Sequence, residues 1–443
     1  MTGSALGLEF PAVCGRQVTG VFDGGDLTSD AGVALVGAAD GKLGLTAALA
    51  GVIPERRQAG KIAHPLVELL RTRVYAIAQG YEDANDLDRL REDPALKTAC
   101  GRLPETGAAL ASQPTVSRLE NRLEQGDLIR MGKALAERVI AQLPEGSSEV
   151  TIDVDVTDDP CHGQQQLQVF NAFYDEHCYL PLLVYVTGSD GVQRLVSGLL
   201  RPGNVGPTRG LWRVLRVVVD LIRRRLPGVR ITLRGDSGFG VAEVLRMCHR
   251  LQLGYLLGLA ANPVVTRLAT PVQMDAALKY RWEGDGCREF GEFRYAAQTW
   301  QQPERVIVKA EITRGELNPR YAITDVETLT PEQVYTWYCQ RGDRENRIKE
   351  LKLDLASGRT SCHRFLANQA RLLLHMAAGV LLTAMQTALA GTQWATAQVS
   401  TLRTRLLKVG ARVVQSARRI WLHLPSAFPE QAVWALLVRH LTG

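Results

Sequence analysis

Apolar residues recur every three or four positions between residues 64 and 97, in the segment HPLVELLRTRVYAIAQGYEDANDLDRLREDPALK. This spacing places the apolar side chains on one face of a helix, and turns are expected at Gly80 and near Pro94. Helix-like runs also precede and follow this segment. We therefore expect residues 1–145 to form an all-α N-terminal region.

A second helix is expected in SQPTVSRLENRLEQ, where Ser112 is a candidate N-cap. Arg118 and Arg122 follow within the first turns of this helix. A helix with cationic and polar residues near its start can enter a major groove or hold DNA phosphates. A solvated helix of a bundle gives the same pattern, so both interpretations stay open for each of these side chains.

The pattern changes after a short linker at residues 144–148. The next run, EVTIDVDVTDDP, is rich in β-branched residues and has an acid at every second position, which places Asp153 and Asp155 on the same face of a strand. Two carboxylates on one face repel each other unless a cation or water lies between them. Further along, VRITLRGDSGFG is typical of a buried strand that ends at Asp236 before a glycine-rich turn. An acid at that position either binds a metal or caps the following helix.

Strand-like and helix-like runs alternate from residue 149 onward, which is typical of an α/β core with a mixed sheet flanked by helices. Between residues 262 and 325, strand-like runs separated by proline and glycine turns indicate a β-rich insertion. The expected parts are a helical N-terminal region that binds DNA ends (1–145), a core in two pieces (146–261 and 326–390), the insertion between them (262–325), and a basic, helical C-terminal region (391–443).

The composition indicates a globular protein with two or three domains, because 443 residues with 46% hydrophobic content bury more than one core. A net charge of +6 permits nucleic-acid binding without demonstrating it. Eight cysteines without a CxxC pair give no zinc-binding pattern and suit a reducing compartment. The N-terminus has no signal-peptide pattern, and the most apolar run, from Leu372, is shorter than the ~20 residues of a membrane span. We therefore expect a cytoplasmic protein outside the membrane.

The stretch YCQRGDRENRIKELK, from Tyr338 to Lys352, is expected to form a helix with one charged face. At a step of about 100° per residue from Tyr338, the side chains of Arg341, Glu345 and Lys352 lie within roughly 300–340°. Glu350 faces elsewhere. A carboxylate between two cations suits a metal ion and phosphates, whereas a solvated helix with ion pairs gives the same pattern.

Three acids on separate elements provide the oxygen ligands for a metal site. The first lies on the strand after the linker (Asp155 or Asp153), the second ends a later strand (Asp236), and the third lies on the charged helix (Glu345). Mg²⁺ prefers carboxylate and phosphate oxygens. Two ions about 3.5–4 Å apart can bind both the attacking and the leaving oxygen of a phosphoryl transfer. The sequence therefore favours a metal-dependent phosphoryl-transfer enzyme.

The charged helix also carries a recognisable motif, because Tyr338, Arg341, Glu345 and Lys352 match the pattern Y-x2-R-x3-E-x6-K. With both aspartates in order, the chain resembles a bacterial insertion-sequence transposase of the DDE type, which has a ribonuclease H-like catalytic core. The strings GGDLTSDAG, GYEDANDLDRLREDPAL, DVDVTDDPCHGQQ and RGDSGFG resemble those of the insertion-sequence family numbered thirteen-eighty. The likeness covers nearly the whole chain.

The resemblance implies that Asp236 and Glu345 are catalytic metal ligands. Its D-x-T-like pattern favours Asp155, followed by Thr157, as the first acid, with Asp153 as the alternative. A tryptophan in the insertion of such relatives stacks an unpaired base, and here Trp300 or Trp282 is the candidate, although a tryptophan packed on a strand gives the same sequence. The resemblance also implies that Tyr338, Arg341 and Lys352 hold phosphates near the cleaved end. The full set of candidate DNA contacts is Tyr338, Arg341, Lys349, Lys352, Trp300, Arg118 and Arg122.

The activity that the resemblance implies is cleavage at the ends of an insertion sequence, followed by joining of the freed 3′-hydroxyls to target DNA. The implied cofactors are two Mg²⁺ ions, for which Mn²⁺ is able to substitute. The implied partners are double-stranded DNA, as terminal inverted repeats and target, and a second copy of the chain in the DNA complex, associated with the nucleoid. The same acids would also serve a ribonuclease H-like DNA nuclease without strand transfer. A catalytically silent DNA-binding derivative is the other alternative.

Overall fold

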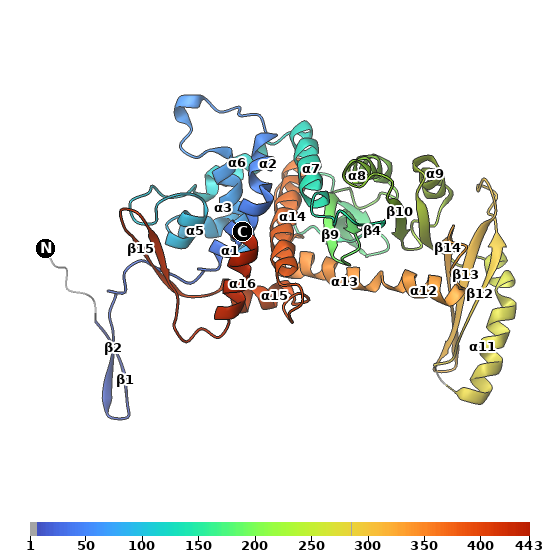
Figure 1. The fold of residues 1–443 in the computed structure, drawn as a ribbon. Helices are drawn as coiled ribbons and strands as arrows, with labels where there is room; N and C mark the ends of the chain where they lie inside the picture. Colours follow the sequence, from blue (N-terminus) through green and yellow to red (C-terminus); the bar gives the residue numbers. More distant parts are fainter. Residues whose placement is uncertain (1–6, 285) are drawn as a thin grey trace. The chain divides into compact units, whose positions relative to one another are not determined.

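The computed structural model describes residues 7–284 and 286–443, except for the side chains of residues 343–345. The chain divides into two compact units (Figure 1), and each is described by itself. The first unit contains Met1–Arg122 and Ala377–Gly443, and the second contains Leu123–Met376. The second unit holds the first piece of the expected core and the whole expected insertion. Two expected parts are divided between the units: residues 123–145 of the N-terminal region lie in the second unit, and residues 377–390 of the second core piece lie in the first, together with the C-terminal region.

A mixed eight-stranded sheet forms the centre of the second unit. Strands β4, β10 and β11 run parallel to one another, and each remaining strand is antiparallel to its neighbours. In spatial order the sheet contains β12 (Arg288–Tyr295), β13 (Glu304–Thr313), β14 (Glu316–Thr324), β11 (Gly254–Leu259), β10 (Arg230–Gly235), β4 (Glu149–Val156), β8 (Leu182–Thr187) and β9 (Gln193–Leu199). This α/β architecture, a mixed sheet flanked by helices, is the one that the sequence predicted.

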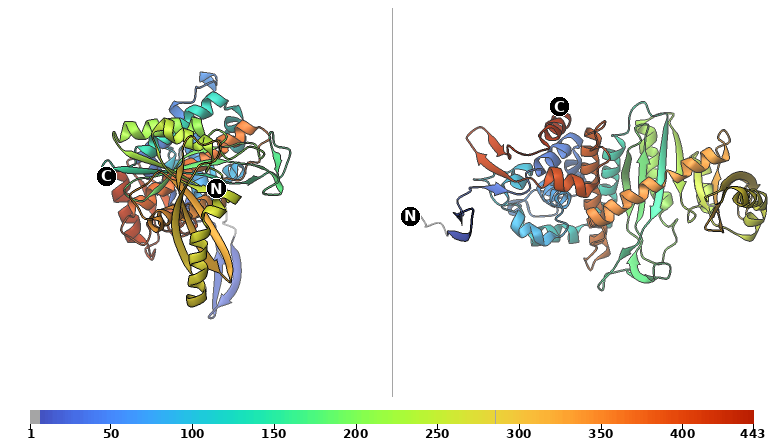
Figure 2. Two further views of the ribbon diagram at one scale, coloured as in Figure 1. Left: turned by 90° about the vertical axis from the view of Figure 1, so that its right-hand side faces the viewer. Right: turned by 90° about the horizontal axis from the view of Figure 1, so that it is seen from below.

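Helices cover both faces of this sheet (Figures 1 and 2). On one side, α8 (Leu211–Arg225) lies beside α9 (Ala242–Leu251) and α7 (Gln125–Ile140). On the other side, α12 (Pro331–Cys339) and α13 (Gly342–Lys349) cross the strands, and α14 (Phe365–Ala388) packs its first half against β9. Seen from below, α12 and α13 lie in front of the sheet (Figure 2, right).

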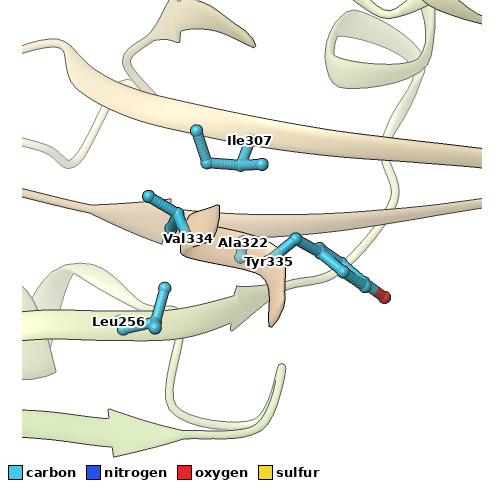
Figure 3. Packing of buried hydrophobic residues seen from close by; sticks show 5 residues of the cluster. All are labelled: Leu256, Ile307, Ala322, Val334 and Tyr335. Carbon is cyan, nitrogen blue, oxygen red and sulfur yellow. The ribbon is translucent and has the colours of Figure 1, made fainter. Parts of the chain in front are cut away.

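The segment expected to form a β-rich insertion begins with two helices, α10 (Pro263–Leu268) and α11 (Thr270–Glu283). Its three strands, β12–β14, then extend the central sheet because β14 pairs with β11. Figure 3 shows that β11, β13, β14 and α12 share one apolar cluster. The cluster contains Leu256, Ile307, Ala322, Val334 and Tyr335. The inserted strands are therefore part of the core that supports α12.

The continuous helix expected from Tyr338 to Leu355 is interrupted twice. Helix α12 ends at Cys339, α13 begins at Gly342, and a π-helical turn, η3, covers Glu350–Asp354. At the first interruption the N–H of Arg341 bonds to the carbonyl of Tyr338, three residues back instead of four. A wider π turn also shifts the side chains that follow it. The expectation of one uninterrupted helical face is therefore wrong, although Tyr338 and Arg341 still lie together.

The first unit is mostly helical, but the expectation of an all-α N-terminal region is wrong. A hairpin of β1 (Leu8–Val13) and β2 (Arg16–Gly20) turns through Cys14 and Gly15, which both have positive φ, as tight hairpin turns require. Strand β3 (Leu27–Thr28) pairs with β15 (Ala411–Gln415), which pairs with β16 (Ile420–His423). The helical elements of this unit are α1 (Val33–Leu43), α2 (Leu45–Gly51), η1 (Ala59–Lys61), α3 (Leu66–Gln79), η2 (Ala84–Asp86), α4 (Leu87–Leu90), α5 (Pro94–Ala99), α6 (Gln113–Arg122), α15 (Val399–Leu402), η4 (Arg403–Leu407) and α16 (Gln431–Thr442).

Helix α14 is longer than the apolar run from Leu372 suggested. Its 24 residues are long and apolar enough to cross a membrane, and 83% of the apolar window is buried inside the protein. Helices α1 and α2, joined by a bend of 60°, pass the same test only as a pair. A core helix of a soluble protein meets these criteria as well, and the burial of α14 agrees with that role.

A small three-stranded sheet follows the end of β4. It contains β5 (Asp159–Pro160), β7 (Glu176–Tyr179) and β6 (Val169–Asn171), in that spatial order. Both pairings are antiparallel, so β6 and β7 form a hairpin that is attached through β5 to the end of β4. This arrangement places the end of β7, at Cys178 and Tyr179, beside the segment that follows β4.

Candidate active site

Asp153 lies in the buried part of β4, opposite Arg234 of the parallel strand β10. Its carboxylate accepts two hydrogen bonds from the Arg234 guanidinium, at 2.6 Å from Nε and 3.0 Å from Nη2. The Nη1 atom of Arg234 donates to the main-chain carbonyl of Trp337 at 2.6 Å. Asp153 is fully buried. Of the two candidates for the first acid, Asp153 therefore belongs to a charged contact that joins β4, β10 and α12.

Asp155 and Asp236 lie at the same edge of the sheet. Because Asp153 is opposite Arg234, two further residues along each segment bring Asp155 of β4 to the level of Asp236, which directly follows the last residue of β10. One carboxylate oxygen of Asp155 accepts from the N–H of Val156 at 2.9 Å. The corresponding oxygen of Asp236 accepts from the N–H of Gly238 at 2.8 Å. The local backbone thus orients both carboxylates.

Arg341 brings a positive charge to these two acids. Its Nη1 atom donates to the Tyr338 hydroxyl at 3.1 Å. Burial alone would lower the pKa of Arg341, but the Tyr338 phenol and the carboxylates of Asp155 and Asp236 raise that pKa above its ordinary value. Arg341, at the break between α12 and α13, thus contacts the Tyr338 phenol, and the charges of Asp155 and Asp236 act on its guanidinium.

Close packing fixes the position of the Tyr338 hydroxyl. A Cβ atom on Gly258 of β11 would lie 2.6 Å from this hydroxyl and 2.6 Å from the backbone nitrogen of Ser237. Only a residue without a side chain allows the tyrosine to approach the turn after Asp236 in this way. Gly258 was not identified by the sequence analysis, because a single glycine in a strand indicates a close approach without showing what approaches.

Lys352, in the π-helical turn η3, pairs with Asp158 and not with Asp155 or Asp236. Its Nζ atom forms an ion pair with Asp158 at 2.9 Å, just beyond the end of β4. Lys349 is exposed on α13, while Glu350 pairs with Arg347 at 2.9 Å. Lys352 therefore lies near the end of β4, and the carboxylate that it contacts is that of Asp158.

Two neighbours of this site were missed by the sequence analysis. Asp159 is buried, and burial raises its pKa to about 8, although the positive charge of Lys352 acts in the opposite direction. Burial and the charges of Asp158, Asp155 and Asp236 raise the pKa of Tyr174 to about 12, so the charges of these acids reach its phenol. The run TDDP after β4 marked this segment as acidic, but its sequence spacing gave no indication of Tyr174.

The donor set suits a hard divalent cation. Asp155 and Asp236 offer carboxylate oxygens from two adjacent strand ends, which is the ligand type that Mg²⁺ prefers. The side chain of Glu345, expected as the third ligand, lies outside the described residues, although its backbone belongs to α13. Among the side chains that the structure describes, no group of three or more His, Cys, Asp or Glu residues has a metal-binding arrangement. The two aspartates thus fit the implied ion, which one or two carboxylates, waters and substrate phosphates commonly hold.

The remaining candidates lie on other elements. Trp300 is half-buried and its ring packs against Tyr295 at 5.2 Å, whereas Trp282 on α11 is 88% exposed. In the first unit, Arg118 is exposed on α6 and Arg122 is partly buried at the end of the same helix. Of the two tryptophans, Trp282 is therefore the one whose ring is accessible to a stacking base.

A comparison with protein-family models places the chain in a known family. The family model described as "Transposase DDE domain group 1" matches residues 10–442. Among solved structures, the piggyBac transposase synaptic complex with hairpin DNA is similar to this chain with a TM-score of 0.43 and 10% sequence identity. That similarity covers 86% of this chain and 79% of the other. A comparison with curated proteins found no match.

Proposed function

Because the chain belongs to the transposase DDE domain group 1 family, we propose that it cleaves the ends of an insertion sequence and joins the 3′-hydroxyls to target DNA. The observation that supports this activity is the placement of Asp155 beside Asp236 at adjacent parallel strand ends, with both carboxylate charges acting on the Arg341 guanidinium. Carboxylates hold metal ions and a guanidinium binds phosphate, so this group contains the parts of a phosphoryl-transfer site.

We propose Asp155, Asp236 and Glu345 as the ligands of two Mg²⁺ ions, for which Mn²⁺ is able to substitute. When bound, such ions activate the attacking oxygen and stabilise the leaving oxygen of a phosphoryl transfer. Asp153 is not proposed as a ligand, because its carboxylate is held by Arg234 in the core. The turn N–H groups on Asp155 and Asp236 keep the two carboxylates oriented before any ion binds.

The basic side chains around the acids would hold DNA phosphates. Arg341 is directed by Tyr338 and offers a planar fork of donors, which suits a phosphate near the cleaved bond. Lys352 would exchange its ion pair with Asp158 for a phosphate, and the exposed Lys349 would contact the backbone further away. These contacts would place the scissile phosphate over the acids.

The finer assignment is a ribonuclease H-like core of the insertion-sequence family numbered thirteen-eighty. The order β9-β8-β4-β10-β11, with helices on both faces, supports such a core. Two acids at the ends of its adjacent parallel strands support it as well. The motif on α12 and α13 is the sequence feature that favours this branch of transposases.

DNA ends would be recognised outside the core. We assign this role to the helical N-terminal region with Arg118 and Arg122, and stacking of an unpaired base to Trp282 in preference to Trp300 because of its exposure. A homodimer in the DNA complex is supported by the β1–β2 hairpin, which stands apart from the helices of its unit (Figure 1). Isolated two-stranded hairpins are marginally stable in water, so a second copy would cover its exposed apolar residues, which are Leu8, Phe10, Val13 and Val18.

The test of the proposed function is a joining assay with a DNA end that carries a pre-cut 3′-hydroxyl. The substrate contains the inverted repeat that flanks the gene, and the wild-type chain is incubated with target DNA and Mg²⁺. We expect joined products, because the site has the parts to direct a hydroxyl as well as water at phosphate. Hydrolysis without joining would favour the nuclease, and binding without any cleavage would favour the silent derivative.

A further inference from the structure

The most exposed aromatic side chain near the acids is Phe173, which is 87% exposed at the turn between β6 and β7. Large apolar side chains at that level of exposure contribute nothing to the core of the protein that carries them. The ring nevertheless has one aromatic neighbour, because Phe173 and Tyr174 meet edge to face with centroids 4.9 Å apart. An exposed ring supported on one edge leaves its faces open to a ligand.

The turn that presents Phe173 is rigidly built. The side-chain oxygen of Asn171 accepts from the N–H groups of Phe173 at 2.9 Å and Tyr174 at 3.1 Å. The amide of Asn171 donates to the carbonyl of Gly203 at 2.6 Å. A Cβ atom on Gly203 would lie 2.4 Å from two main-chain oxygens, so only glycine fits at this anchor. The turn therefore has a fixed shape that does not depend on Phe173 itself.

The turn also lies within reach of the charges of the candidate site. The hairpin is anchored beside this site, because β7 pairs through Cys178 and Tyr179 with β5, which begins four residues after Asp155. The phenol of Tyr174 is close enough to Asp155 and Asp236 for both charges to act on it. Because Phe173 contacts Tyr174, its ring lies at the margin of the same group of acids.

We propose that Phe173, supported by Tyr174, stacks against an unpaired nucleobase of the nucleotide beside the scissile phosphate. This inference rests on the proposed DNA-cleaving function. Every base has an aromatic face, so a neutral ring holds it without adding charge beside carboxylates that must bind metal. The contact is separate from that of Trp282, which lies on α11 in the inserted segment.

The test measures how tightly the full-length chain binds an intact DNA end and a set of modified ends. Each modified end lacks one base, at a position just before or just after the scissile phosphate. Stacking of one base contributes to affinity by roughly 10-fold to 100-fold. We expect Phe173→Ala to weaken binding of the intact end by that factor and to have no further effect on the end that lacks the stacked base. Phe173→Trp should bind the intact end as the wild type does.

Two controls separate stacking from other effects. Phe170→Ala removes another phenyl ring of the same hairpin, which packs on His177, and should leave DNA affinity unchanged. Phe173→Leu should lose affinity as Phe173→Ala does, because leucine is apolar but has no aromatic face. Thermal unfolding of both Phe173 variants should match the wild type, since the ring is exposed.

Three results would overturn the proposal. Equal binding by wild type and Phe173→Ala would remove any role in DNA contact, and the proposed transposase function would still stand if the wild type cleaves. An equal loss on every abasic end, or full affinity with Phe173→Leu, would show an apolar contact of another kind. If the wild type neither binds nor cleaves the DNA end, the proposed function fails together with this inference.

Discussion

Replacing Asp155 or Asp236 by asparagine is expected to lower the rate of DNA-end cleavage and joining by roughly 1000-fold, because bound ions supply several kcal/mol to phosphoryl transfer. Asparagine keeps the oxygen that accepts from Val156 in the first case and from Gly238 in the second. The fold should therefore be retained while the negative charge is lost. The measurement is single-turnover cleavage in Mg²⁺, with thermal unfolding of each variant alongside.

The matched control is Asp220→Asn on α8, which removes an exposed carboxylate that pairs with Arg224. This variant should cleave at the wild-type rate, since exposed ion pairs contribute little to stability. A rate for Asp155→Asn or Asp236→Asn within about tenfold of wild type would contradict the assignment, because that corresponds to only about 1.4 kcal/mol.

Replacing Asp153 by asparagine is expected to lower the free energy of unfolding by about 3–5 kcal/mol, because it leaves a buried guanidinium without its carboxylate. Arg234 holds Asp153 and the Trp337 carbonyl at once, so the loss should loosen the contact between the sheet and α12. The measurement is unfolding in denaturant. Asp155→Asn, on the same strand, should lose much less stability.

A double variant tests whether Asp153 stabilises the fold or binds a metal ion. Replacing both Asp153 and Arg234 by apolar residues of similar volume should recover much of the lost stability, because removing a buried pair together avoids the unpaired charge. If Asp153→Asn were instead as stable as wild type but inactive, Asp153 would be a metal ligand and Asp155 would not.

The sequence predicted the strand elements of the site well, because alternation along a strand is a local property. The period-two pattern of TIDVDV placed Asp153 and Asp155 on one face of β4, and the run RITLRGD placed Asp236 after a buried strand. The pattern could not separate the two acids on β4. That distinction depends on Arg234, which lies 81 residues away in sequence and meets Asp153 only through strand pairing.

The helical part of the site was harder to predict. A fixed step per residue assumes an unbroken helix, and the backbone departs from it at Arg341 and again in the π-helical turn. Lys352 consequently contacts Asp158, a partner that depends on the path of the chain after β4. The hairpin of β1 and β2 was missed for a different reason, because a single short turn at Cys14 and Gly15 is a weak signal within a mostly helical region.

The location of bound Mn²⁺ tests the central assignment most directly. Crystals of the wild-type chain with a DNA end, grown with Mn²⁺, would show the ions by their anomalous scattering. We predict an ion within about 2.0–2.3 Å of carboxylate oxygens from both Asp155 and Asp236, close to the distance that Mg²⁺ adopts. Ions bound elsewhere, or bound through Asp153 with Arg234 displaced, would contradict the account.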